Sequence, residues 1–128
     1  MNLDKVLAGF FIIFAMTLNF GFFYGDPSMM QLHSKYELFG AIIVNIIATI
    51  LKLGDKTQLG SVLIATSLVA DLQLILAATI WTIFGDNSAN ISIDPEYFGV
   101  IISLSGGALL ANITSVVLYV GETLKSKR

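Results

Sequence analysis

The sequence predicts an all-α integral membrane protein with four transmembrane helices. The chain has 128 residues, of which 55% are hydrophobic and only 12% are charged, and its mean hydropathy is +0.82. Soluble domains carry about 25% charged residues, so this chain has too few to cover a globular surface. Its apolar residues form four segments, at about 3–24, 36–53, 59–84 and 97–120. Each has about the 20 residues that a helix needs to cross roughly 30 Å of hydrocarbon.

The first segment, residues 3–24, is predicted to be a retained helix and not a signal peptide. It is too long for the apolar part of a signal peptide, and no small-x-small cleavage motif precedes Asp26. The second segment, residues 36–53, is the shortest and is expected to be the least tilted. A glycine follows each of the four segments, as is typical of helix C-terminal caps: Gly25, Gly54, Gly85 and Gly121.

The third and fourth segments carry the most unusual residues. Asp71 lies in the middle of segment 59–84, inside the apolar run "SLVADLQLIL". The fourth segment, residues 97–120, contains Gly106 and Gly107 at mid-length. The loops between the segments are short, so we expect one compact four-helix domain over residues 1–128, without linkers.

The orientation follows from the lysines and arginines. Positive residues are retained on the cytoplasmic side of a membrane, and an even number of spans places both termini on one side. That side holds Lys5, Lys52, Lys56, Lys125, Lys127 and Arg128, whereas the other side holds only Lys35. The sequence therefore predicts a multi-pass protein of the bacterial inner membrane with both termini cytoplasmic. The charge bias also argues against dual topology.

The two halves of the chain resemble each other. "YELFGAIIV" at 36–44 matches "PEYFGVIIS" at 95–103, and "NIIATILKLGD" at 45–55 matches "NITSVVLYVGE" at 112–122. In the predicted topology both halves run in the same direction, which indicates a parallel duplication of a two-helix hairpin. The alternative is chance similarity between apolar segments, which use few residue types.

Polar side chains within the spans form the candidate site. They recur at helical spacing, as Asn45, Thr49 and Lys52 do, so each set occupies one helix face, which should point toward protein or water and away from lipid. Several fall near the middle of their spans, and we expect them to meet in a midplane cluster. The predicted pathway or ion-binding residues are Asp71, Gln73, Asn45, Asn112, Thr49 and Ser67.

Two interpretations of this cluster compete. For the amides of Asn45 and Asn112 a structural role is the favoured interpretation, because hydrogen bonds between membrane helices contribute roughly 0.6 to 2 kcal/mol each. Asp71 favours function, since an acid at the bilayer centre costs roughly 2.5–3.5 kcal/mol on insertion scales. No lysine or arginine lies at the centre of a span to neutralise it. We therefore expect Asp71 to line a polar path and to bind a cation or a proton.

Four glycines within the spans are predicted to permit close helix packing. They are Gly40, Gly99, Gly106 and Gly107. For the adjacent pair Gly106 and Gly107 an alternative remains, namely a break in the helix that exposes backbone carbonyls to ions.

Several classes of function are excluded. The chain has no cysteine and one histidine, which excludes disulfides, thiolate metal sites and a histidine-rich metal site within one chain. The net charge of −2 makes nucleic acid an unsuitable partner. No histidine accompanies a nucleophile and no span contains two carboxylates, so we expect neither an enzyme nor a cofactor.

The four spans and the small size resemble small four-helix proteins of bacterial inner membranes, and this resemblance implies no activity and no site residues. The chain lacks the first-helix glutamate of small multidrug exporters and the glycine–arginine signature of fluoride channels. The predicted function is a channel or transporter for a small cation or proton, working as a homo-oligomer in the lipid bilayer. The alternative is a non-transporting subunit that binds and regulates a partner membrane protein.

Overall fold

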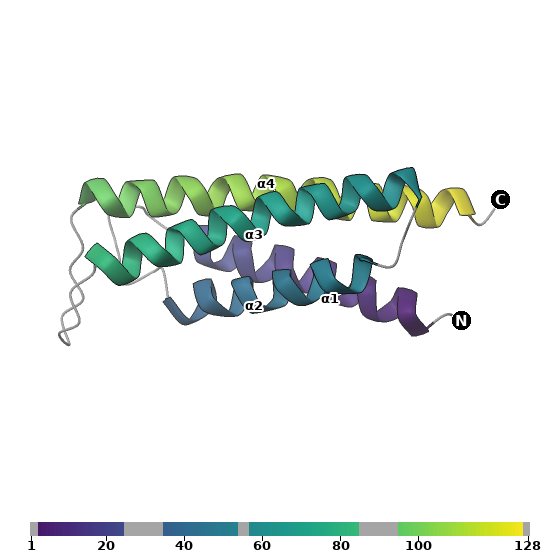
Figure 1. Ribbon diagram of the computed structural model, residues 1–128, viewed down its shortest axis with the longest axis horizontal. Helices are drawn as coiled ribbons and strands as arrows, with labels where there is room; N and C mark the ends of the chain where they lie inside the picture. Colours follow the sequence, from purple (N-terminus) through teal and green to yellow (C-terminus); the bar gives the residue numbers. More distant parts are fainter. Residues whose placement is uncertain (1–2, 25–34, 54–56, 85–94, 127–128) are drawn as a thin grey trace.

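The chain folds into four α-helices. The computed structural model describes residues 3–24, 35–53, 57–84 and 95–126. Its helices are α1 (Leu3–Phe23), α2 (Lys35–Lys52), α3 (Gln58–Phe84) and α4 (Pro95–Ser126). They run alternately up and down a common long axis, as Figure 1 shows. We call the end where α1 begins and α4 ends the termini end, and the opposite end the far end.

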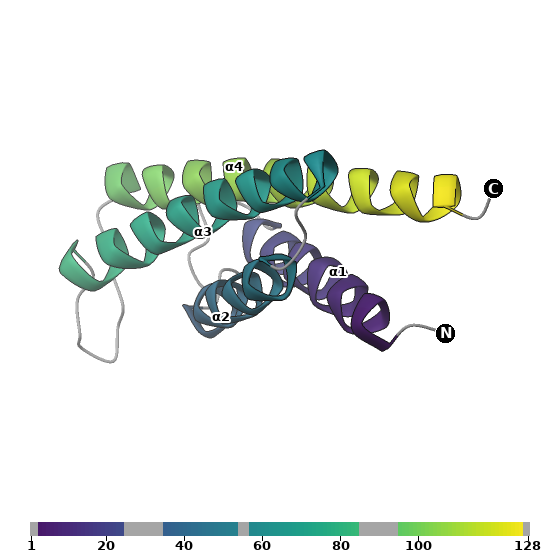
Figure 2. The same ribbon diagram turned by 45° about the vertical axis from the view of Figure 1, so that its right-hand side comes forward.

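The helices are arranged as a ring. α1 packs against α2, α2 against α3, α3 against α4, and α4 closes the ring against α1, whereas the two diagonal pairs hardly touch. The α3–α4 contact is the most extensive and the α2–α3 contact the least. Neighbouring helices are antiparallel, as in up-down-up-down bundles with short connections. α4 extends beyond the other helices at the termini end (Figure 2), where residues 121–125 are all exposed.

Aromatic side chains fill the interior of the far half. The ring of Trp81 on α3 lies 5.9 Å from that of Phe22 on α1 and 5.9 Å from that of Phe98 on α4. Leu38 on α2 is fully buried in the same cluster. Aromatic pairs of this kind contribute about 0.5–1.5 kcal/mol beyond their area burial. One side chain from each of the four helices therefore packs in the interior at this end of the bundle.

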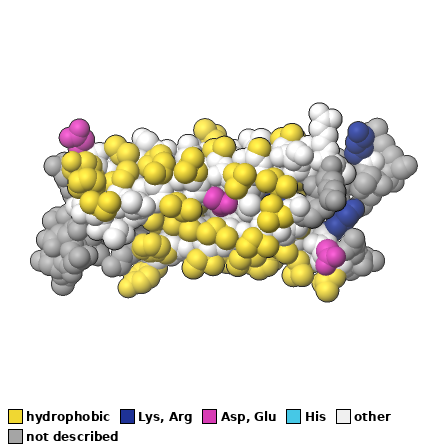
Figure 3. All heavy atoms as spheres, viewed as in Figure 1, with side chains coloured by type: hydrophobic (Ala, Val, Ile, Leu, Met, Phe, Trp, Pro, Cys, Tyr) yellow, Lys and Arg dark blue, Asp and Glu magenta, His cyan; other side chains and the backbone are white. Residues whose placement is uncertain are grey.

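The outer surface is apolar and the interior contains small and polar residues. Large hydrophobic side chains cover the face shown in Figure 3, with charge mainly near its two ends. The buried residues include many alanines, together with asparagine, serine and threonine. This distribution is the reverse of that in a soluble bundle and is what a hydrocarbon environment requires, because polar groups must find partners inside the protein.

Three helices are long and apolar enough to cross a membrane: α1, α3 and α4. α2 differs because its 18 residues include Lys35, Glu37 and Lys52. The sequence predicted four spans; three of the helices have the length and apolar composition that a span needs, and α2 with its three charged residues does not.

The predicted helix limits agree with the structure except at the end of α4. Gly121 was expected to cap this helix, but α4 continues through it to Ser126. A glycine within a helix costs about 1 kcal/mol relative to alanine, a cost that the helix tolerates here. The other three predicted caps lie outside the described residues.

The two halves of the bundle run in the same direction, but their burial agrees at only some of the matched positions. In the first match Leu38 is buried whereas Tyr97 is exposed, and Phe39 is exposed whereas Phe98 is buried. In the second match the burial agrees, since Asn45 and Asn112 are both buried, as are Ala48 and Ser115. The duplication therefore stays a prediction.

Candidate functional site

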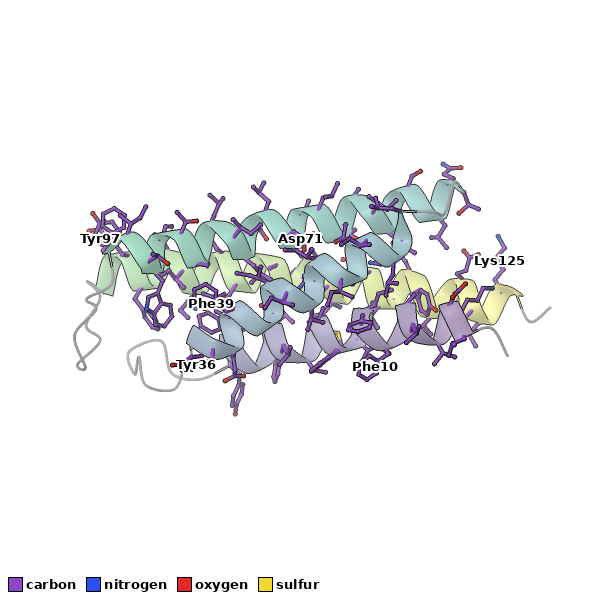
Figure 4. All side chains as sticks on the ribbon, turned by 60° about the horizontal axis from the view of Figure 1, so that its bottom comes forward. Phe10, Tyr36, Phe39, Asp71, Tyr97 and Lys125 are labelled. Carbon is purple, nitrogen blue, oxygen red and sulfur yellow. The ribbon has the colours of Figure 1, made fainter. Side chains whose placement is uncertain are left out.

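Asp71 lies between α2 and α3, about midway between Lys125 at the termini end and Tyr97 at the far end (Figure 4). Its Oδ2 accepts a hydrogen bond of 2.7 Å from Thr49 Oγ1. The same hydroxyl approaches the carbonyl oxygen of Asn45 at 2.9 Å. One hydroxyl hydrogen thus faces two acceptors, and both side chains are buried, Asp71 with 8% of its surface exposed and Thr49 with 7%.

A second polar pair lies beside the first, nearer the termini end. The ammonium of Lys52 on α2 donates to Ser67 Oγ on α3 at 2.5 Å. Ser67 precedes Asp71 by one helical turn, and Lys52 follows Thr49 by nearly one turn, so the two pairs are neighbours along the α2–α3 interface. We call Thr49, Lys52, Ser67 and Asp71 the polar seam.

The polar seam contains a lysine, Lys52, that was counted for membrane orientation and not among the predicted pathway residues. Lys52 is 6% exposed, and its positive charge acts on Asp71. The sequence-based expectation considered only a lysine or arginine at the centre of a span, and not one that reaches inward from the end of α2. Its spacing from Thr49 already placed Lys52 on the buried face of α2, but its position in the last turn suggested a side chain directed to water.

Two buried oxygens at this level have no hydrogen-bond partner: Asp71 Oδ1 and Gln73 Oε1. They do not belong to one site, because two residues along a helix turn the side chain by about 200°. Gln73 lies against α4, where a Cβ at Gly107 would be only 2.7 Å from its Oε1. The structure thus brings Asp71, Thr49 and Ser67 together and directs Gln73 elsewhere.

A separate polar cluster joins α1 to α4. In the amide orientation that satisfies both its nitrogen and its oxygen, Asn19 donates to the Ser105 carbonyl at 3.2 Å and accepts from the Leu109 N–H at 2.9 Å. It also accepts from Asn112 Nδ2 at 3.1 Å. Asn112 therefore meets Asn19 and not Asp71, while Asn45 bonds to the Ala41 carbonyl of its own helix. The residues of the single midplane cluster predicted from the sequence are thus divided among three interfaces, α2–α3, α3–α4 and α1–α4.

The glycines of α4 allow close approach of the neighbouring helices. A Cβ at Gly106 would lie 2.8 Å from the ring of Phe23, and α4 remains helical through both glycines, with no break. Gly40 has ordinary space around it, and at Gly99 nothing lies within 4 Å. Gly9 on α1 was not among the predicted packing glycines, yet a Cβ there would lie 3.2 Å from the ring of Tyr119.

A cavity of about 240 Å³ opens at the termini end, with walls from all four helices. Its lining consists of Asp4, Lys5, Ala8, Leu51, Lys52, Leu59, Leu63, Tyr119, Glu122 and Thr123. We call it the termini-end cavity. Because Lys52 belongs both to its wall and to the polar seam, the seam runs from this cavity to the middle of the bundle.

Beyond Asp71 the α2–α3 interface becomes apolar. An open groove of about 360 Å³ lies there, lined mainly by Phe39, Ile42, Ile75 and Ile83, with Ala78, Thr79 and Thr82. The hydroxyls of Thr79 and Thr82 bond to carbonyls of their own helix. Within the described residues the polar seam therefore ends at Asp71.

The described part of the chain contains no group of three or more histidine, cysteine, aspartate or glutamate side chains that could hold a metal ion. What the polar seam offers is one carboxylate, one ammonium and two hydroxyls. Such groups exchange hydrogen bonds and protons, but they supply few oxygen ligands for a metal ion.

The fold and the polar seam define a class, namely small α-helical bundles with an apolar exterior and buried ionisable residues, a lysine and an aspartate, between two helices. Residues 32–123 match a family of unknown function, DUF6394, and the chain belongs to this family. The match includes the whole polar seam and excludes all of α1. No curated protein and no solved structure is significantly similar to the chain.

Proposed function

We propose that this protein crosses the bacterial inner membrane four times, with both termini in the cytoplasm, and works there as a homo-oligomer. The apolar exterior supports insertion, and the lysines at the termini end, such as Lys5 and Lys125, support the orientation. α2, with about 27 Å of helix, crosses beside α1 and α3, against which it packs. We also retain the duplicated hairpin as a proposal, on the strength of the sequence match.

The function that the geometry supports best is the transfer of protons, with Asp71 as the group that binds them. The observation that carries this proposal is the buried chain of polar groups from Lys52 at the termini-end cavity to Asp71 at mid-bundle. Ionisable residues within membrane spans are costly to bury, and they mark proton relays and ion paths.

The polar seam accommodates both protonation states of Asp71 without rearrangement. When Asp71 is ionised, Thr49 donates to its Oδ2. When Asp71 carries a proton on Oδ2, it donates to Thr49 Oγ1, and Thr49 donates to the Asn45 carbonyl instead. In that state the unpartnered Oδ1 is a neutral carbonyl oxygen, which costs less to bury than a charged one. A metal cation, by contrast, would be repelled by the ammonium of Lys52.

The test is proton flux into proteoliposomes that contain a pH-sensitive dye, under a potassium diffusion potential. We expect flux with the native protein and none with Asp71→Asn at equal incorporation. Glu96→Gln makes the same chemical change at the far end, outside the polar seam, and should retain flux. Equal flux in the native protein and in Asp71→Asn would refute the role of Asp71.

A second candidate is supported by the apolar groove. Since the polar seam ends at Asp71 and the interface beyond it is open and apolar, a helix of a partner membrane protein fits there. In this alternative the chain is a non-transporting subunit that binds and regulates that partner. Copurification of one membrane protein at fixed stoichiometry, lost in Ile75→Trp, together with an absence of flux by the isolated protein, would favour it.

A further inference from the structure

We propose that the termini-end cavity binds the headgroup of a zwitterionic phospholipid, which carries one phosphate and one ammonium group. The proposal concerns a binding site distinct from Asp71, and it does not depend on proton transfer. It rests on the depth of the cavity, the charges in its wall and the apolar residues beside them.

The cavity lies at the level of lipid headgroups. Its lining residues come from the first two turns of α1 and of α3, the last turn of α2, and the part of α4 around Tyr119. In the proposed orientation this is the cytoplasmic boundary of the membrane, where lysine and tyrosine side chains typically lie. A phospholipid in the adjacent leaflet reaches this depth without leaving the bilayer.

The charged groups in the wall match a zwitterion. Lys5 and Lys52 are balanced by Asp4 and Glu122, so the lining carries no net charge. Lys52 is fixed, because its ammonium is buried and bonded to Ser67 Oγ. Lysines bind phosphate as point charges, and carboxylates accept hydrogen bonds from an ammonium. An anionic headgroup without an ammonium would add a negative charge to a lining that already contains two carboxylates.

The rest of the cavity wall is apolar, and a contact between α1 and α4 holds it in place. Leu59 and Leu63 provide a surface for the glycerol and upper acyl carbons of a lipid. The hydroxyl of Tyr119 donates to the Lys5 carbonyl at 2.5 Å and so ties α1 to α4 at this level. The ring of Tyr119 packs closely against Gly9, so α1 and α4 are in contact at this part of the cavity wall. Such a combination of apolar surface and few polar groups is typical of ligand sites.

The experiment is native mass spectrometry of the delipidated protein, titrated with phosphatidylethanolamine or phosphatidylglycerol of identical acyl chains. We expect phosphatidylethanolamine to bind at least about tenfold more tightly, as one lost charge-assisted contact implies. Leu59→Trp, which fills the cavity, and Lys5→Met, which removes an exposed charge from its wall, should each abolish that preference. Lys125→Met, a matched lysine outside the cavity, should preserve it.

Other outcomes would overturn the proposal. Equal binding of both lipids would indicate only a non-specific lipid annulus. A preference that survives in both Leu59→Trp and Lys5→Met would place the site elsewhere. Binding of soluble glycerophosphoethanolamine without binding of the lipid would assign the cavity to a soluble metabolite. None of these results bears on proton flux, so this proposal and the proposed function fail separately.

Discussion

Replacement of Lys52 by methionine measures how strongly the polar seam depends on its buried charge. Methionine keeps most of the apolar stem but removes the ammonium, which donates to Ser67 Oγ and attracts Asp71. A hydrogen bond from a charged group contributes about 1.5–3 kcal/mol, and leaving a buried charge without compensation costs more. We therefore expect Lys52→Met to lower the free energy of unfolding by about 3 kcal/mol.

The same substitution should cost less when Asp71 is already neutral. In an Asp71→Asn background no negative charge is left unpaired, so Lys52→Met should then cost only about 1–2 kcal/mol. The coupling between the two residues is thus at least about 1 kcal/mol. Reversible unfolding of the four variants in mixed detergent micelles, followed by circular dichroism, provides this double-mutant cycle.

Additive effects would refute this reasoning. If the two substitutions add to within about 0.5 kcal/mol, the buried charges do not interact and the polar seam is only a set of separate hydrogen bonds. Lys125→Met serves as the control, since Lys125 is exposed at the end of α4. It should change stability by less than about 0.5 kcal/mol.

Three further predictions concern helix packing and can be measured by the same unfolding assay. Gly107→Ala should lower the free energy of unfolding by about 1 kcal/mol, because the added methyl group displaces the Gln73 amide. Gly99→Ala has open space and should be neutral or stabilising. A larger loss of stability in Gly99→Ala than in Gly107→Ala would contradict this packing. Asn19→Leu should cost about 2–3 kcal/mol through the loss of its contacts with α4, and a neutral effect would show that these bonds are not formed. Gly121→Ala should stabilise by about 0.5–1 kcal/mol and raise helicity, since α4 continues through this position; destabilisation would indicate a helix end there.

The sequence predicted the helices well because their signals are local. Long apolar segments bounded by loops define the helices to within a few residues, except where Gly121 failed to end α4. The helical spacing of Asn45, Thr49 and Lys52 correctly predicted one buried face. These inferences need only the chain's own periodicity and not the identity of its neighbours.

The partners of the polar residues could not be predicted in the same way. Asn112 and Asp71 lie near the middle of their helices, yet they face different neighbours, because helix rotation depends on packing around the whole ring. Lys52 was missed as a partner for Asp71 since a long side chain in a last turn can extend either to water or inward. The spacing of residues along one helix predicts which of them share a face. Which residues of a neighbouring helix they contact depends on how the helices pack against one another.

The length of α4 has a practical consequence. Its 32 residues span about 48 Å at 1.5 Å per residue, well beyond the roughly 30 Å of a hydrocarbon layer. The exposed residues 121–125 thus continue the helix beyond the rest of the bundle. Spin labels placed there one at a time would differ by about 1.5 Å in position along the helix axis and by about 100° in direction around it, from one residue to the next. Their accessibility to aqueous and lipid-soluble relaxation agents would locate the membrane surface on the protein without altering a single interior residue.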